Sequence, residues 1–198
     1  MHDLRPYLEH LASLHDHLCP RQILGLRMGL YAGQQLGLSL PQSDKRLFTF
    51  VETDGCFADG VLAATGCSLG HRTLRLVDFG KVAATFVDTL TGQALRLAPL
   101  PTARQAAEHC CPAAASRWHA QLEAYQVMPA DHLFSVQSVA LAVSLQAIIS
   151  QPGLRVLCDQ CGEEIMNARE VRIDGRALCR ACAGEAYYTP CLSQEMAE

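Results

Sequence analysis

The chain of 198 residues is 49% hydrophobic and 18% charged, a composition that supports a folded core and excludes a disordered chain. Its formal net charge of −4 argues against a dedicated nucleic-acid binder. No apolar stretch is long enough to span a membrane, and the N-terminus lacks the apolar segment of a signal peptide. The length suits one domain with a small appendage, and we expect neither export nor a membrane anchor.

The chain contains ten cysteines, which is many for its length. Four of them have the spacing of a zinc site, and several others lie beside histidines. This pattern fits metal binding in a reducing compartment better than a disulfide framework. We therefore predict a cytoplasmic protein that binds metal.

Two helices are expected in the N-terminal part of the chain. The first covers residues 3–14, and the second runs from Pro20 to about Leu36 and stops at Gly37. Three glycines of the second helix share one stripe, because they repeat every fourth residue. They are Gly25, Gly29 and Gly33. The stripe indicates either the close approach of another helix or backbone, including one across a dimer interface, or small residues tolerated in a tight core.

The segment between these helices carries His15, His17 and Cys19, directly before Pro20. Imidazole and thiolate are preferred ligands of soft and borderline transition metals. Because proline is favourable at the first helical position, Cys19 is expected at the N-cap, where the helix dipole favours a thiolate. The alternative is a buried cysteine with two ordinary surface histidines. The clustering favours a site for metal binding or nucleophilic chemistry.

A predicted strand at residues 47–53 leads through a turn to Cys56 and a short helix over residues 57–65. Cys56 therefore matches Cys19 in position, since both are expected to begin a helix. Two such thiolates are suited to bind one ion. Cys67 follows in a loop, and we expect it to be buried rather than a ligand.

Further along, strands are predicted at residues 74–79, 83–90 and 94–97, as an antiparallel meander. Residues 99–127 are predicted to be helical, with a break at Cys110-Cys111-Pro112. We expect the two cysteines at this break to have no functional role. A strand is predicted at residues 131–140, and its continuation to residue 149 allows strand or helix. A turn at Gln151-Pro152-Gly153 marks a boundary, which divides the chain into a core of residues 1–150 and a second domain of residues 151–198.

The second domain contains two cysteine pairs, Cys158 with Cys161 and Cys179 with Cys182, separated by seventeen residues. This spacing predicts a zinc ribbon, with a hairpin over residues 171–178 that leads into the second pair. Four thiolates complete the coordination shell, so the site is structural, and the metal supplies the folding energy of the ribbon. The ribbon lacks the basic footprint of a nucleic-acid module, which favours a protein partner.

Three segments carry a family resemblance, and they are LHDHLCPRQILGLRMG, ETDGCFADGVLAATGCSLG and DFGKVAATFVDTLTG. In content, order and spacing they resemble the FmdE family, which is named after one of the subunits of formylmethanofuran dehydrogenase. The C-terminal cysteine pairs resemble the zinc ribbon that many members carry. The resemblance covers residues 10–97 and the ribbon, and it is weak over residues 98–150.

The resemblance implies an α+β core with a mixed or antiparallel sheet packed with helices, a homodimer, and a metal at the His/Cys segment. By motif, His17, Cys19 and Cys56 match the metal-site positions of the family, with His15 beside them. Asp78, Gly80 and Lys81 match another recurrent motif. The family name comes from molybdenum or tungsten pterin enzymes of one-carbon metabolism, although many members occur in organisms that do not make methane.

Two residues depart from the family pattern. Asp16 stands in place of a usual glycine between the histidines, and Arg21 in place of the glycine after Cys-Pro. Both residues are larger and charged. They would narrow the site or, in the case of Asp16, add a ligand.

Two classes of function follow. The first is a metal-binding enzyme or metallocofactor-handling protein, in which His17, Cys19 and Cys56 hold a second divalent metal, expected to be zinc, with an open fourth position. His15 would then act as a reserve ligand or proton carrier, and Lys81 would neutralise a small anionic ligand. The second class is a non-enzymatic adaptor whose ribbon binds a protein partner. The residues favour metal binding, and they specify neither a substrate nor a reaction.

Overall fold

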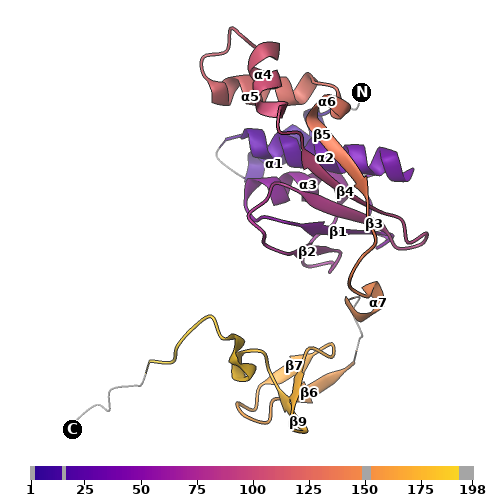
Figure 1. The fold of residues 1–198 in the computed structure, drawn as a ribbon, viewed down its shortest axis with the longest axis vertical. Coiled ribbons are helices and arrows are strands. Elements are labelled where there is room, and N and C mark those ends of the chain that lie inside the picture. The colour runs from indigo at the N-terminus through magenta and orange to yellow at the C-terminus, as the bar shows by residue number, and fades with distance from the viewer. Residues whose placement is uncertain (1–2, 15–16, 149–152, 192–198) are drawn as a thin grey trace, which may run out of the picture. The chain divides into compact units, whose positions relative to one another are not determined.

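The computed structural model describes residues 3–14, 17–148 and 153–191 (Figure 1). The chain divides into two compact units, residues 1–144 and 145–198, each with its own core. The predicted boundary at residue 150 lies outside the described residues and stays a prediction. In the part of the chain that is described, no helix has the length and hydrophobicity needed to cross a membrane.

The first unit has an α+β fold, as the sequence predicts. Its helices are α1 (Arg5–Leu14), α2 (Pro20–Leu36), α3 (Cys56–Thr65), α4 (Ala103–Cys110), α5 (Arg117–Val127) and α6 (Ala130–Leu133). Its strands are β1 (Leu47–Val51), β2 (Leu74–Leu76), β3 (Ala84–Asp88), β4 (Ala94–Pro99) and β5 (Phe134–Ser138). The predicted start of α2 at Pro20, its stop at Gly37 and the break near Cys110 are confirmed.

Among the described residues, five strands form one mixed sheet in the order β2-β1-β3-β4-β5. β2 runs parallel to β1, and the other neighbouring strands are antiparallel. The predicted meander is therefore wrong for β2 and β3, which both pair with β1 and not with each other. The reason is that α3 connects β1 to β2, and a helical crossover allows parallel pairing where a tight turn does not.

The strand predicted at residues 131–140 is correct only in its middle. Residues Ala130–Leu133 form α6, and β5 begins at Phe134. Pro129 precedes α6, and the buried side chain of Leu133 anchors it in the core. The following ambiguous segment contains the short helix α7 (Leu145–Ile148), which belongs to the second unit.

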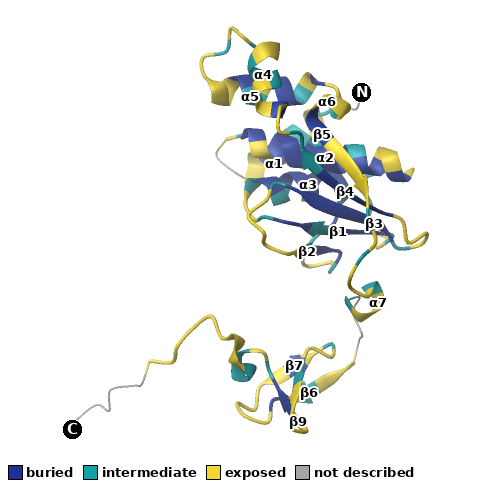
Figure 2. Ribbon diagram, in the orientation of Figure 1, coloured by how far each residue is buried: buried dark blue, intermediate teal, exposed yellow. Residues whose placement is uncertain are grey.

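The main core lies between the helices and one face of the sheet, where the dark blue strands of Figure 2 meet α2 and α3. Alternate residues of a strand point to the same face, so each strand contributes every second side chain. The core includes Ile23 and Met28 of α2, Leu47 and Val51 of β1, Phe86 of β3, and Leu95 and Leu97 of β4.

Helices α2 and α3 pack with their backbones in contact. A Cβ atom built on Gly25 would lie 2.2 Å from the carbonyl oxygen of Phe57, and one built on Gly60 would lie 2.1 Å from that of Gln22. The close-approach interpretation of the glycine stripe is therefore correct at Gly25. Gly29 faces Ala64 of the same helix α3, so this stripe packs within the chain and does not support a dimer.

Arg27 ties α2 to the C-terminal end of α5. Its guanidinium donates hydrogen bonds to the carbonyl oxygens of Tyr125, Gln126 and Met128, at 2.8, 2.7 and 2.7 Å. These carbonyls carry the negative end of the α5 dipole, which a cation stabilises. Burial lowers the pKa of Arg27. The contact fixes α5 against the helix that begins at Cys19.

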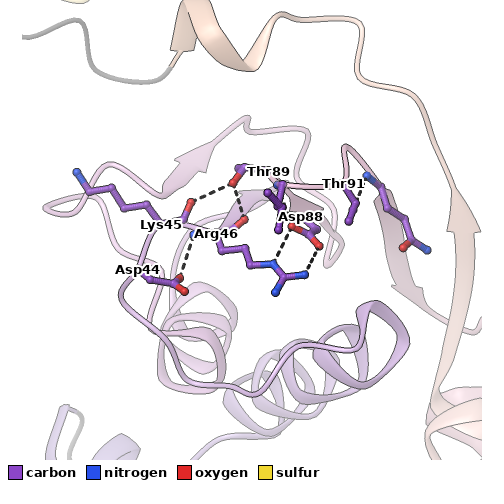
Figure 3. Close-up of polar contacts among 8 residues, drawn as sticks. Asp44, Lys45, Arg46, Asp88, Thr89 and Thr91 are labelled. Carbon is purple, nitrogen blue, oxygen red and sulfur yellow. Dashed lines mark hydrogen bonds and ion pairs between the residues drawn. The ribbon is translucent and has the colours of Figure 1, made fainter.

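An ion pair with a buried carboxylate closes the β3–β4 hairpin onto the segment before β1 (Figure 3). Arg46 donates to both carboxylate oxygens of Asp88, at 3.1 and 2.8 Å, and the amide of Leu90 donates to the same carboxylate at 2.9 Å. The Arg46 guanidinium is the main cause that lowers the pKa of Asp88 to about 2. Thr89 extends the contact through its hydroxyl, which donates to the carbonyl oxygen of Arg46 at 2.9 Å.

The second unit is built from two hairpins around four cysteines. One hairpin pairs β6 (Arg155–Leu157) with β7 (Glu164–Met166), and the other pairs β8 (Val171–Ile173) with β9 (Arg176–Leu178). A short helical turn at Ala181–Glu185 follows. The core of this unit is small and includes Cys158, Ile165 and Leu178. So little burial cannot fold the unit alone, which agrees with the predicted need for metal.

Replacing Gly25 with alanine tests the contact between α2 and α3. The added methyl meets backbone, which cannot rotate away, so we expect G25A to lose about 2 kcal/mol of unfolding free energy despite the higher helix propensity of alanine. Gly33 is the matched control in the same helix, because its added Cβ would meet the flexible end of Leu40. Urea unfolding followed by the fluorescence of Trp118, the single tryptophan, measures both variants. Equal stability of G25A and G33A would contradict the packing argument.

Replacing Asp88 with asparagine tests the ion pair with Arg46 and its pH dependence. The pKa of Asp88 falls from 3.8 to about 2 on folding, a shift equivalent to about 2 kcal/mol of stability. Since the folded pKa is the lower one, this contribution is complete above about pH 4 and is lost as the pH falls towards 2. We expect D88N to cost about 2 kcal/mol at neutral pH and the difference from wild type to shrink with acid, as measured by urea unfolding at each pH.

The control for D88N is the exposed ion pair between Asp3 and Arg5, whose atoms lie 2.8 Å apart at the surface. An exposed pair of this kind adds little to stability because water and salt screen it. D3N should therefore leave the unfolding free energy unchanged within error. A D88N penalty that stays constant down to pH 2 would show that the carboxylate charge is not the source of the stability.

Candidate functional site

The ends of α2 and α3 position two cysteines. Cys19 is the N-cap of α2, and its amide donates to the side-chain oxygen of Gln22 at 2.8 Å. Cys56 is the first residue of α3 and follows Gly55, whose φ of 74° suits glycine. Both positions confirm the sequence prediction that each cysteine begins a helix. Because α2 and α3 cross through Gly25 and Gly60, their N-terminal ends lie together.

The thiols of Cys19 and Cys56 are neighbours. Burial raises the pKa of Cys56, and a hydrogen bond with the Cys19 side chain raises it further, as does the charge of Asp59. Cys19 is buried and Cys56 is partly buried. A cation between the two thiols would reverse this effect, since it favours both thiolates. The two cysteines thus stand at neighbouring helix ends, while a sulfur separation that suits one ion and the shared metal stay predictions.

The predicted histidine ligands are not assembled with these thiols. His17 is exposed, and its ring centroid lies 6.5 Å from that of Trp118 on α5. Within residues 3–14, 17–148 and 153–191, the ligand atoms of His17, Cys19 and Cys56 do not all lie within 4.8 Å of one another. His15, the predicted reserve ligand, and Asp16 lie outside the described residues.

Lys81 belongs to a loop anchored at the end of β1. The amides of Phe79 and Lys81 both donate to the carbonyl oxygen of Glu52, at 2.9 and 3.1 Å. Lys81 is exposed, and its ammonium lies 6.0 Å from the centroid of the Phe79 ring. The anchor at Glu52 holds the loop next to the chain that continues to Cys56. The proposed role of Lys81 towards an anion remains a prediction.

A pocket of about 630 Å³ opens beside Cys19. Arg21 of α2, Arg104 of α4 and the aromatic side chains of Trp118 and Tyr125 on α5 contribute to its walls. The contribution of α4 and α5 could not be predicted from the sequence, because residues 98–150 carry no recognisable motif. The available signal was the single tryptophan near the start of a helix whose N-cap is a serine.

The ribbon cysteines form a complete donor set. The sulfur atoms of the four predicted ligands lie within 4.8 Å of one another, and these ligands are Cys158, Cys161, Cys179 and Cys182. The sulfurs of Cys161 and Cys179 are 3.9 Å apart. Two thiolates on one tetrahedral zinc ion, each with a bond of about 2.3 Å, lie roughly 3.8 Å apart. The cluster therefore fits zinc in number, type and spacing.

Backbone amides support the thiolates of the ribbon. The amide of Cys179 donates to the sulfur of Cys158 at 3.3 Å, and that of Cys182 donates to the sulfur of Cys179 at 3.4 Å. Amides of Cys161 and Cys179 lower the pKa of Cys158 to about 6. The side chain of Cys179 is the main cause that raises the pKa of Cys182 to about 12. Thiols this crowded need a cation to ionise together.

The remaining cysteines do not join either site. Cys67 is buried, as predicted, and its thiol donates to the carbonyl oxygen of Leu47 at 3.4 Å. Burial raises its pKa. Cys110 and Cys191 are exposed, and Cys111 is partly buried. All ten cysteines are described, and each is a free thiol.

Residues 14–135 match the family model described as FmdE, molybdenum formylmethanofuran dehydrogenase operon, over more than half of the chain. The chain belongs to the FmdE family. Residues 152–188 of this FmdE chain match the model of the prokaryotic dksA/traR C4-type zinc finger. The family model covers Cys19 and Cys56, and the zinc-finger model covers the four ribbon cysteines.

Two known proteins are similar to this FmdE chain. A tungsten formylmethanofuran dehydrogenase FmdE-like protein from Syntrophus aciditrophicus has a crystal structure that matches with a TM-score of 0.59 and 21% identity, over 95% of this chain and 96% of that one. This likeness shows the fold. A probable S-adenosyl-L-methionine-binding protein from Archaeoglobus fulgidus is 38% identical over 78 residues, which are 38% of this chain and 21% of that protein. The chain thus spans about a fifth of that relative.

Replacing Cys179 with serine tests the ribbon. Loss of one of four ligands should release the zinc, and the small core around Ile165 cannot hold the unit folded without it. We expect the amides of residues 158–182 to lose their protection from hydrogen exchange, while Trp118 in the first unit keeps its wild-type unfolding curve. C191S is the control, because Cys191 is exposed and lies outside the cluster. Protection of the ribbon amides that persists without zinc would refute its metal dependence.

Proposed function

We propose that this FmdE protein binds a divalent metal, expected to be zinc, in its first unit through His17, Cys19 and Cys56, in addition to the zinc of the ribbon. The observation that supports the proposal is that Cys19 and Cys56 stand at the N-terminal ends of two helices whose backbones touch, and that the Cys19 side chain helps raise the pKa of Cys56. Helix N-termini favour thiolates, and neighbouring thiols on separate helices form a chelate with little rearrangement.

The donor set suits a reactive rather than a structural site. Two thiolates and one imidazole leave a fourth position for water or a small ligand, and a metal there would act as a Lewis acid. The imidazole of His17 would have to turn towards the cysteines from its place beside Trp118. In the described structure, the buried side-chain nitrogen of Gln22 has no hydrogen-bond partner, although Gln22 caps Cys19.

The other residues have supporting roles in this proposal. His15 would carry a proton or replace a ligand, and Lys81 would neutralise the charge of a small anion. The location that suits reduced metal-binding thiols is the cytoplasm.

We further propose that the protein forms a homodimer and that its ribbon contacts a protein partner. The family membership supports the dimer, and light scattering that finds a monomer at micromolar concentration would exclude it. The exposed Tyr187 and the lack of a basic excess in the ribbon sequence support a protein rather than a nucleic-acid partner. The family name also suggests a link to molybdenum or tungsten enzymes of one-carbon metabolism.

A second candidate function is that of an adaptor without a core metal. The observation in its favour is that, in the described part of the chain, only the ribbon cysteines gather as a metal cluster. An adaptor would use the ribbon to bind its partner and would keep Cys19 and Cys56 as ordinary packing residues. The two functions differ in the number of bound metal ions.

Replacing Cys56 with serine decides between the two functions. We expect two zinc ions per wild-type chain and one in C56S, as measured by elemental analysis of purified protein. C110S is the matched control, since Cys110 is an exposed thiol outside both sites, and it should keep the wild-type metal content. One zinc ion in both the wild type and C56S would exclude the core metal and favour the adaptor.

A further inference from the structure

The pocket beside Cys19 is built to hold a small molecule. Its volume of about 630 Å³ lies within the range of roughly 300–1,000 Å³ that small-ligand sites occupy. It opens where the first turn of α2 meets α4 and α5, and Cys19 forms part of its wall. A molecule in this pocket would therefore lie next to one of the proposed metal ligands.

The charged side chains on the pocket wall are both cations. Arg21 and Arg104 line it, and no carboxylate is among the described residues that do. Glu108, one helical turn beyond Arg104, instead pairs with Arg117, with 3.6 Å between nitrogen and oxygen. In the described ranges, the side chains of Arg21 and Arg104 form neither an ion pair nor a hydrogen bond. Two such guanidinium groups suit a carboxylate or a similar planar anion.

The remainder of the pocket wall suits a flat apolar group. Trp118 lines the pocket with 41% of its surface exposed, and the partly buried Leu100 supplies further apolar surface. A ring that stacks on an exposed indole removes apolar surface of both groups from water. The neighbouring helices hold this wall in place, because Arg27 fixes the end of α5 to α2.

We propose that this pocket binds a small aromatic anion, whose ring contacts Trp118 and whose negative group lies between Arg21 and Arg104. This inference rests on the proposed function only in making the anion a neighbour of the core metal.

The test is calorimetric titration of the full-length protein with naphthalene-2-carboxylate. Two probes separate charge from ring: naphthalene-2-carboxamide lacks the charge, and cyclohexanecarboxylate lacks the aromatic ring. We expect the aromatic carboxylate to bind and each of the other two to bind about tenfold more weakly or not at all. Failure of the aromatic carboxylate to bind at millimolar concentration, or equal binding of carboxylate and carboxamide, would overturn the inference.

Variants locate the binding. R21Q and R104Q should each weaken the aromatic carboxylate about tenfold without changing the weaker affinity of the carboxamide. R5Q is the matched control, because Arg5 is an exposed arginine of α1 that does not line the pocket. The affinity of R5Q should equal that of wild type. Equal losses in R104Q and R5Q would show that net charge, and not the pocket, attracts the anion.

The C56S variant separates this inference from the proposed metal site. Cys56 does not line the pocket, so the anion should still bind to C56S, even though that variant loses its core metal. If the anion binds to C56S but the wild-type protein contains only one zinc ion, the pocket proposal stands and the metal proposal is wrong. If the wild-type protein contains two zinc ions but does not bind the anion, the metal proposal stands and the pocket proposal is wrong. Loss of binding in C56S would show that the metal, and not the arginine pair, holds the anion.

Discussion

The backbone contact between α2 and α3 is the constraint on which the rest of the first unit depends. Glycine at positions 25 and 60 allows each helix to touch the carbonyl groups of the other, where any side chain would clash. The contact brings the helix N-termini together, and with them the thiols of Cys19 and Cys56. Both glycines reduce intrinsic helix stability. The close packing that they permit compensates through burial of Ile23, Phe57 and Val61.

The same end of α2 joins two kinds of surface. One is formed by the cysteines that we propose as metal ligands, and the other is the adjoining pocket with its two arginines and its indole, which Cys19 also lines. Arg27 links these surfaces, since it connects α2 to the carbonyl end of α5 and so sets the position of Trp118 relative to Cys19. A molecule in the pocket would lie next to Cys19, which lines the pocket and is one of the proposed metal ligands.

The two units of the chain are stabilised by different means. The first has a large apolar core and an ion pair between Arg46 and the buried carboxylate of Asp88, which fixes a hairpin. The second has a core too small to fold alone and depends on four thiols that do not ionise together without a cation. Loss of metal should therefore affect the second unit first. The family and zinc-finger matches follow this division, because they cover separate parts of the chain.

The sequence by itself determined the local features of this protein: the start of α2 at Pro20, the cysteines at two helix starts, and the ribbon spacing. These features depend on residues close together in the chain, such as proline at a first helical position or cysteines separated by two residues. Only the tertiary structure decided the partner of the glycine stripe, the parallel pairing of β2 with β1, and the place of Trp118 beside His17. The proximity of Cys19 to Cys56 belongs to the second group, as does the pocket that joins Arg21 to Arg104. These contacts connect residues far apart in sequence, and helix crossing and sheet order set them, which no local pattern specifies.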